Sequence, residues 1–278
     1  MDGFILEAPP NKKVVLLLHG MTGGPIELAQ FGKYIHKKGY DVYCPVIPGH
    51  CRGIEEIRSA TWQDWHVFAL NQFDELNKKY EEVYVSGICL GAVLAFDIAQ
   101  ERPKDVAGVG GLSTTLFLDG WGNPWFKFLF PLGLYTVLKF FYSFPESEPY
   151  GTKNERIRKQ VVKILKEDPS ILDCFPMVSI KELLSLSGFV RKNVHKISTP
   201  FILLHSTLDD ITSLKSSDFI FINASSKIKQ YIELKDSYHL IIRDNERRLV
   251  FEKTVNFFDE ISSKISKKTC LTELKDLF

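Results

Sequence analysis

Residues 82–100, EVYVSGICLGAVLAFDIAQ, combine a short strand-forming run, a tight turn and an apolar helical stretch. The run at 82–86 is β-rich, GICLG occupies 87–91, and residues 92–100 have a helical pattern. A strand that turns this sharply into a helix holds the central side chain of the turn in a strained, exposed position. Glycine is needed on both sides, since a Cβ there would collide with neighbouring backbone. The sequence therefore predicts a nucleophile elbow with Cys89 at its tip.

A thiolate at Cys89 would gain from the positive end of the helix that follows it. The backbone amide of Leu90 would be free to donate to an oxyanion. A cysteine among apolar residues is usually an inert part of a core, but its place between strand and helix favours the nucleophile here. Structural positions in a strand, a loop, an insertion and the tail are predicted for the other four cysteines: Cys44, Cys51, Cys174 and Cys270.

Short buried strands recur on both sides of this segment. Residues 14–18 are five consecutive apolar residues, as in a strand covered on both faces of a parallel sheet. Helical patterns lie between the strands, the clearest beginning at Thr61 with a capping box to Asp64, and another following Asp244. The alternation predicts an α/β fold with a mostly parallel central sheet and helices on both faces. Further strands are expected at 41–46, 106–112, 201–205 and 230–234.

The alternation breaks once, between about residues 119 and 196, where the strand signal vanishes and the chain is aromatic and then helical and charged. We interpret this segment as a cap inserted into one core. The predicted organisation is therefore a first core part at 1–118, a cap at 119–196 and a second core part at 197–278.

A second oxyanion donor is expected after the first long strand, where residues 19–24 are HGMTGG. The glycines allow this turn to swing a backbone amide toward the elbow, and Met21 is the natural donor. We expect His19 to be a hydrogen-bonded structural histidine, and His50 to be a turn residue although it could border the pocket.

A nucleophile needs a base, and the base needs an orienting acid. His239 follows the strand at 230–234, and Asp209 follows the strand at 201–205, so the chain order nucleophile, acid, histidine suits this fold. The adjacent Asp210 competes for the role of the acid, and we favour Asp209. His205 lies inside a strand, where a satisfied core role is expected.

Composition excludes several other classes. Lysine and arginine (35) balance aspartate and glutamate (34), so no net charge recruits nucleic acid. Five cysteines without regular spacing suggest neither a disulfide framework nor a zinc site, and we expect no metal ion or cofactor. The amino terminus lacks a secretory pattern, and residues 125–141 are too short and too charged to span a membrane. A cytoplasmic location is the expectation, and the oligomeric state stays open.

With these motifs the chain resembles the α/β-hydrolase carboxylesterases and monoacylglycerol lipases of bacteria. The resemblance includes the HGMTG turn, the elbow, the Asp209 segment and Ser237-Tyr238-His239, and so spans both ends of the chain. It implies nucleophile Cys89, acid Asp209, base His239 and oxyanion amides of Met21 and Leu90. The cap would then be a lid whose aromatics contact a hydrophobic acyl substrate, among them Trp121, Trp125 and Phe126. Packing of the cap onto the core would explain these aromatics equally well.

Cys89 departs from this family, because the esterases carry serine at the elbow. A cysteine there is similar to dienelactone hydrolases and polyhydroxyalkanoate synthases, and an introduced Ser→Cys replacement would look the same. We favour an acyl hydrolase acting on a small-molecule ester or thioester. An acyltransferase passing the acyl group from Cys89 to a nucleophile other than water remains an alternative, as does a binding module without turnover.

Overall fold

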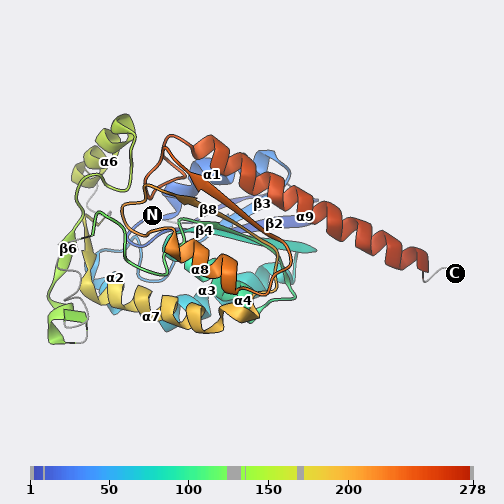
Figure 1. Ribbon diagram of the computed structural model, residues 1–278, viewed down its shortest axis with the longest axis horizontal. Helices are drawn as coiled ribbons and strands as arrows, with labels where there is room; N and C mark the ends of the chain where they lie inside the picture. Colours follow the sequence, from blue (N-terminus) through green and yellow to red (C-terminus); the bar gives the residue numbers. More distant parts are fainter. Residues whose placement is uncertain (1–2, 9, 124–132, 135, 168–171, 276–278) are drawn as a thin grey trace.

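The computed structural model describes residues 3–8, 10–123, 133–134, 136–167 and 172–275. Within them, seven strands form one sheet in the order β1-β3-β2-β4-β5-β8-β9 (Figure 1). Neighbouring strands are parallel except β1, which runs antiparallel to β3 at the edge. The strands are β1 (Phe4–Leu6), β2 (Lys13–Leu18), β3 (Asp41–Cys44), β4 (Glu82–Ile88), β5 (Val106–Leu112), β8 (Phe201–Ser206) and β9 (Lys229–Leu234).

The predicted mostly parallel sheet is confirmed, with each expected strand within two residues of its predicted bounds. The sequence missed β1, whose three residues are too few to show the alternation that marks a strand. The central strands are the most buried, and Val14–Leu18 have no exposed surface. Parallel strands end at the same edge of a sheet, so the loops that follow β2, β4, β8 and β9 meet there.

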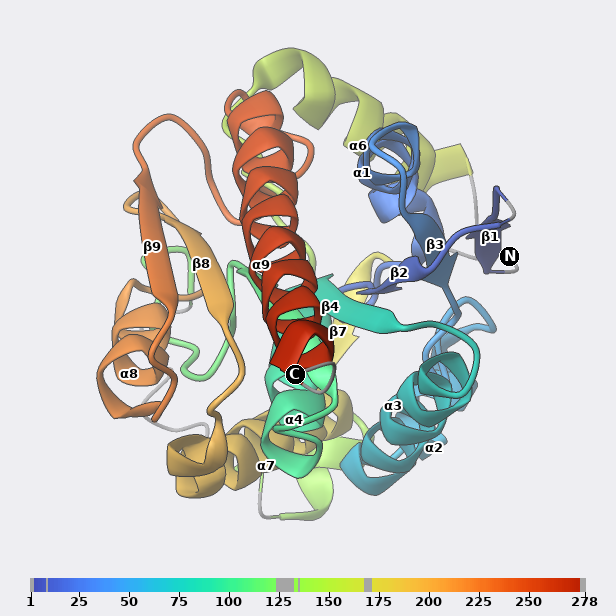
Figure 2. The same ribbon diagram turned by 90° about the vertical axis from the view of Figure 1, so that its right-hand side faces the viewer.

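Helices cover both faces of the sheet (Figure 2). On one face lie α1 (Pro25–Lys37) and α9 (Arg247–Lys275), and on the other α3 (Trp62–Asn77), α4 (Leu90–Glu101) and α8 (Lys215–Asn223). The predicted capping box is present: the Asp64 backbone N–H donates to Thr61 Oγ1 at 3.3 Å, and the Thr61 N–H donates to the Asp64 carboxylate at 2.9 Å. None of the helices in the described part of the chain is both long and apolar enough to cross a membrane.

The segment predicted as a cap has two structural parts. Residues before 177 contain η2 (Val137–Phe140), the antiparallel pair β6 (Ser143–Pro145) and β7 (Cys174–Pro176), and α6 (Glu155–Glu167). The strand signal vanishes in this part of the sequence because strands of three residues leave no periodic pattern. Helix α7 (Met177–Asn193) instead packs on α3 and α4 and buries Leu186 and Val190 completely, so it belongs to the layer that covers the sheet.

Candidate active site

Cys89 lies at the turn between β4 and α4, as the sequence predicted. Its backbone has φ +55° and ψ −116°, a conformation that costs free energy for a residue with a Cβ. The turn is held because the Cys89 N–H donates to the Leu112 carbonyl at 3.1 Å, and the Cys89 carbonyl accepts from Ala92 N–H at 3.1 Å. The strained residue therefore projects its thiol from the carboxyl edge of the sheet.

The two glycines of the turn allow the helix to cross the strands closely. A Cβ on Gly91 would lie 1.9 Å from the Leu18 carbonyl oxygen, and one on Gly87 would lie 2.3 Å from the Gly91 carbonyl carbon. Both distances are far below van der Waals contact, and the obstructing atoms are backbone. The steric reason inferred from the sequence for these glycines is confirmed.

Gly91→Ala is expected to lower the free energy of unfolding by about 3 kcal/mol or more, because α4 cannot approach β2 with the added methyl group. Urea denaturation would measure the change. Gly188→Ala is the matched control, since a Cβ on this α7 glycine would have its nearest neighbour 3.8 Å away, at an arginine nitrogen. Helix propensity should make the control more stable by about 0.5–1 kcal/mol. Equal effects in both variants would contradict the steric argument.

The structure brings His239 and Asp209 together in the loops after β9 and β8. His239 Nδ1 lies 2.9 Å and 3.1 Å from the two oxygens of the Asp209 carboxylate. That carboxylate also accepts from the backbone N–H groups of Ile211 and Thr212, each at 2.9 Å. Both side chains are almost completely buried. The acid is thus held by two backbone N–H groups and orients the imidazole so that its other nitrogen interacts with Cys89.

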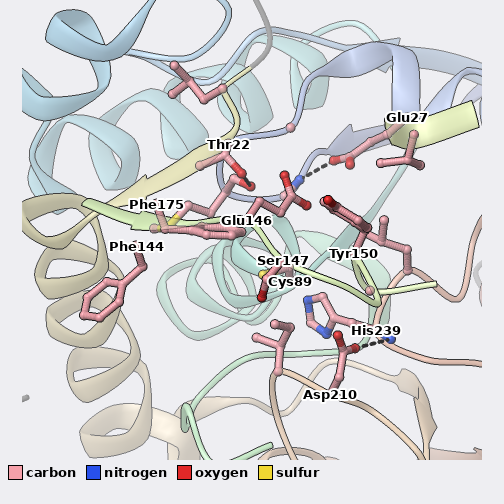
Figure 3. A pocket seen from close by; sticks show the side chains of 18 of the residues that line it. Thr22, Glu27, Cys89, Phe144, Glu146, Ser147, Tyr150, Phe175, Asp210 and His239 are labelled. Atoms are coloured by element: carbon pink, nitrogen blue, oxygen red, sulfur yellow. Dashed lines mark hydrogen bonds between the residues drawn. The ribbon is translucent and has the colours of Figure 1, made fainter. Parts of the chain in front are cut away.

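Asp210, the alternative acid, has a different position. Its Oδ1 accepts from the backbone N–H of His239 at 3.2 Å, and its side chain lines the cavity. The dashed line at Asp210 in Figure 3 marks this contact. Asp210 therefore supports the loop that carries the base, whereas Asp209 contacts the ring of the base.

A second histidine lies behind the Asp209 carboxylate. His205 Nε2 is 3.3 Å from Asp209 Oδ2 and 3.1 Å from the Thr212 carbonyl oxygen, and its Nδ1 is 2.7 Å from Ser217 Oγ. Two acceptors near Nε2 indicate that this nitrogen carries the proton. The predicted core position is confirmed, since the ring is fully buried. The contact with Asp209 was not predicted, because a histidine inside a strand gives no sign of what its ring meets.

The loop of His239 is tied to the segment before α6 through the buried Asp244. Its carboxylate accepts from the backbone N–H of Tyr238 at 2.8 Å, Lys153 at 2.7 Å and Asn154 at 2.9 Å. One acidic side chain thus joins the loop that carries the base to the cap segment. The arrangement explains why an aspartate accompanies Ser237-Tyr238-His239 in the sequence.

Electrostatics in this group favour a charged pair of thiolate and imidazolium. Burial raises the pKa of the Cys89 thiol, but the charge of His239 and hydrogen bonding outweigh it and leave that pKa below its usual value. Burial lowers the pKa of His239, but the negative charges of Asp209 and Cys89 hold it well above the usual value. Burial raises the pKa of Asp209, but His239 and His205 lower it by more, so the net pKa is below the usual value. Both charge and hydrogen bonding therefore couple the imidazole of His239 to the sulfur of Cys89, and charge is the larger of these two contributions.

Met21 and Leu90, the two predicted oxyanion donors, both have backbone N–H groups beside Cys89. Leu90 is the first residue of α4, where a backbone N–H has no partner within the helix. The backbone N–H of Met21 reaches the Cys89 sulfur and helps to lower its pKa. His19 is a structural residue, as predicted: it is fully buried, its Nδ1 donates to the Gly20 carbonyl at 2.9 Å and its Nε2 accepts from Ile47 N–H at 3.0 Å.

A cavity of about 480 Å³ opens over Cys89 and His239 (Figure 3). Its wall is partly apolar, with Leu118 from the segment after β5, Phe144 and Phe175 from β6 and β7, and Ile180 and Leu183 from α7. Three carboxyl groups, those of Glu27, Glu146 and Asp210, also line it, together with Arg243. In the described part of the chain no cluster of histidine, cysteine and acidic side chains is arranged to hold a metal ion.

The carboxyl groups of the cavity are half-buried at Glu27 and Glu146 and buried at Asp210, and they influence one another. Burial raises the pKa of Glu146 to about 7, and the nearby Glu27, Asp173 and Asp210 add to the effect. Burial also raises the pKa of Glu27, whose Oε1 accepts from Gly20 N–H at 2.6 Å. These residues could not be predicted from the sequence, because acidic side chains in a helix or a cap are usually solvated. The cavity is therefore apolar on one side and acidic near the thiol.

The predicted substrate contacts of the cap require correction. Trp121 is 60% exposed, its indole N–H donates to the Leu208 carbonyl at 3.0 Å, and it is not among the residues that line the cavity. Its neighbour Gly122 lines the cavity instead. Trp125 and Phe126 lie outside the described residues. His50, expected as a turn residue, is buried and does border the cavity.

Comparisons with known proteins agree on one superfamily. The sequence model of a family described as "Serine aminopeptidase, S33" matches residues 9–246. A carboxylesterase of Bacillus subtilis (strain 168) is 24% identical over 250 residues, which cover 90% of this chain and 93% of the relative. A thermostable monoacylglycerol lipase of Bacillus sp. (strain H-257) is 22% identical over 250 residues, which cover 88% of this chain and 89% of the relative.

Solved structures show the same fold. The monoacylglycerol lipase of Paleococcus ferrophilus aligns with a TM-score of 0.73 at 23% identity, over 92% of this chain and 100% of the other. A structure described with LipS and LipT, two metagenome-derived lipolytic enzymes, aligns with a TM-score of 0.77 at 20% identity, over 92% of this chain and 97% of the other.

Proposed function

The chain belongs to the serine aminopeptidase S33 family of α/β-hydrolases, and from that premise we propose that it cleaves carboxylic esters through an acyl thioester on Cys89. The family predicted from the motifs is thereby confirmed, and the chain is an enzyme of the esterase and lipase type. The proposal for the mechanism rests on one observation. Cys89, the imidazole of His239 and the carboxylate of Asp209 meet at one edge of the sheet beside a cavity.

Acylation begins with the thiolate of Cys89 and the imidazolium of His239. A sulfur electron pair forms a bond to the ester carbonyl carbon, and the carbonyl π electrons move to oxygen, where the N–H groups of Met21 and Leu90 hold the negative charge. The carbonyl then re-forms and the C–O bond to the alcohol breaks. His239 donates its Nε2 proton to the leaving alkoxide, and Asp209 stabilises the charged ring until that transfer.

Hydrolysis of the thioester uses the same groups in reverse. Neutral His239 takes a proton from water at Nε2, and the oxygen of that water attacks the thioester carbon. The second tetrahedral intermediate collapses with cleavage of the C–S bond, whose electron pair returns to Cys89. The carboxylic acid leaves and the pair of thiolate and imidazolium is restored. Each proton that His239 gives in the first half is recovered in the second.

The cavity supports a substrate with an apolar acyl group and an uncharged alcohol. Leu118, Phe144, Phe175 and Leu183 give the acyl chain an apolar wall. The carboxyl groups near the thiol disfavour an anionic leaving group at the same place. Neutral carboxylic esters therefore fit better than acyl groups attached to a polyanionic carrier. The relatives, a carboxylesterase and a monoacylglycerol lipase, point to the same substrate class.

Rapid-mixing experiments with p-nitrophenyl butyrate would test the covalent step. We expect a burst of p-nitrophenol equal to the enzyme concentration, followed by turnover, and a transient mass increase of one butyryl group on the peptide that carries Cys89. Turnover without a detectable adduct, or an adduct on another residue, would contradict the proposal. A stable adduct that is released by added alcohol but not by water would identify an acyltransferase in place of a hydrolase.

A further inference from the structure

A threonine hydroxyl lies against the reactive sulfur. Thr115 Oγ1 is 3.5 Å from Cys89 Sγ, within the range of a hydrogen bond to sulfur, and the residue is 1% exposed. The same oxygen is 3.1 Å from the backbone carbonyl of Ser113. A hydroxyl has one proton, so it donates to one of these two acceptors at a time. A thiolate, being charged, is the stronger acceptor of the two.

The position of this hydroxyl is fixed by the corner that follows β5. Ser113 has φ +44°, an uncommon conformation for a residue other than glycine, and its N–H donates to the Leu204 carbonyl in β8 at 2.9 Å. Ser113 Oγ donates to the His239 carbonyl at 2.8 Å, and the Thr115 carbonyl accepts from Ser187 Oγ at 2.9 Å. The corner is thus bonded to the neighbouring strand, to the loop of the base and to α7.

We propose that Thr115 is a further catalytic residue, whose hydroxyl donates a hydrogen bond to the Cys89 thiolate and alternates between that sulfur and the Ser113 carbonyl during turnover. This inference rests on the proposed function, because it takes Cys89 as the nucleophile. It assigns a donor to sulfur itself, in addition to the amides that hold the substrate oxygen. This role could not be predicted from the sequence, since Thr115 is far from the elbow along the chain.

The two acceptors match the two states of the sulfur. In the free enzyme the sulfur carries negative charge and the Thr115 hydroxyl donates to it. After the S–C bond forms, the sulfur belongs to a neutral thioester and is a weak acceptor, so the hydroxyl turns to the Ser113 carbonyl. When the C–S bond breaks, the electron pair returns to sulfur and the hydroxyl turns back. Thr115 keeps its proton throughout, and the effect is to ease departure of the thiolate.

Thr115→Val tests the hydroxyl while keeping the shape of the side chain. The measurement is the rate of iodoacetamide labelling of Cys89 as a function of pH, read by peptide mass. Wild-type labelling should have its midpoint on the acid side of an ordinary thiol. In Thr115→Val the midpoint should move to higher pH by roughly 0.5–1 unit, a three- to tenfold loss of thiolate on the acid side. The plateau at high pH should be unchanged or slightly higher, since a less stabilised thiolate is more nucleophilic.

Two variants provide matched controls. Thr114→Val removes a neighbouring hydroxyl that is equally buried and has no hydrogen-bond partner in the described part of the chain, so the profile should stay as in the wild type. Thr115→Ser keeps the hydroxyl and should restore the wild-type midpoint. The charged groups around the sulfur are present in every variant and cancel in the comparison: Glu27, Glu146, Asp209, Asp210, His239 and Arg243.

Superimposable profiles for Thr115→Val and the wild type would overturn the inference, as would an equal shift in Thr114→Val. Ester turnover gives a second readout: the ratio of deacylation to acylation rates should fall in Thr115→Val, because the thiolate is a poorer leaving group without its donor. Failure of the proposed function would appear differently. In that case the wild type would form no acyl adduct, whatever the labelling profiles showed.

Discussion

Cys89→Ala is expected to reduce kcat for p-nitrophenyl butyrate by roughly 10⁴- to 10⁶-fold, as loss of a nucleophile does in other hydrolases with a triad. The reason is that, among the described residues, no other nucleophilic side chain at this edge of the sheet combines a strained backbone with an interaction with the His239 imidazole. The amides of Met21 and Leu90 would remain and could still polarise a carbonyl group. Residual turnover should therefore be small but above the rate in buffer.

Cys174→Ser is the control for this variant, because Cys174 lies in β7 and does not line the cavity. It should retain wild-type activity. Cys89→Ser is informative as well: a hydroxyl does not ionise beside His239 as the thiol does, so activity should fall below that of the wild type. A serine variant with higher kcat than the wild type would contradict a site adapted to sulfur.

Asp209→Asn is expected to reduce kcat by roughly 10²- to 10⁴-fold with little change in the folded structure. The carboxylate accepts the Nδ1 proton of His239 at 2.9 Å and keeps the pKa of the imidazole high. The amide of an asparagine can instead donate to Nδ1 of His239. This stabilises the tautomer in which Nε2 carries the proton, and in that tautomer Nε2 cannot act as a base. The labelling profile of Cys89 should also move to higher pH, since the imidazolium that stabilises the thiolate is weakened.

Asp210→Asn separates the two neighbouring carboxylates. Its oxygen accepts from the His239 backbone N–H, and an asparagine carbonyl oxygen can do the same. We expect a loss of activity at least tenfold smaller than that of Asp209→Asn. Equal losses in the two variants would assign the acid's role to both residues together. Circular dichroism would show whether either variant is folded.

The fold could be predicted from sequence because its signals are local. Residues 14–18 are continuously apolar and form a central strand of the sheet. The glycines of GICLG permit the close crossing of α4 over β2, where a Cβ on Gly91 would collide with the Leu18 carbonyl. The short edge and cap strands were missed because three residues give no period. The helix α7 was assigned to the cap, since amphipathic spacing does not say which surface a helix covers.

The sequence predicts those site residues that have a suitable side chain and directly follow a strand, and it does not predict the others. Cys89, Asp209 and His239 follow strands whose ends must meet, so topology brought them together. His205, Thr115 and Glu146 contact the site through side chains whose direction depends on tertiary packing. No spacing in the sequence specifies those directions. For the same reason Trp121 was given a role that its exposed position does not support.

The carboxyl groups of Glu27, Glu146 and Asp210 should affect the release of the acid product from the cavity. Cleavage of an ester turns an uncharged reactant into an acid that ionises in water. Inside this cavity that new anion would join three acidic groups whose pKa values burial has already raised. Repulsion by the carboxylates that are ionised favours departure of the anion to solvent over retention. The enzyme should therefore be inhibited weakly by its carboxylic-acid product, and less so as the pH rises above 7, where Glu146 is ionised.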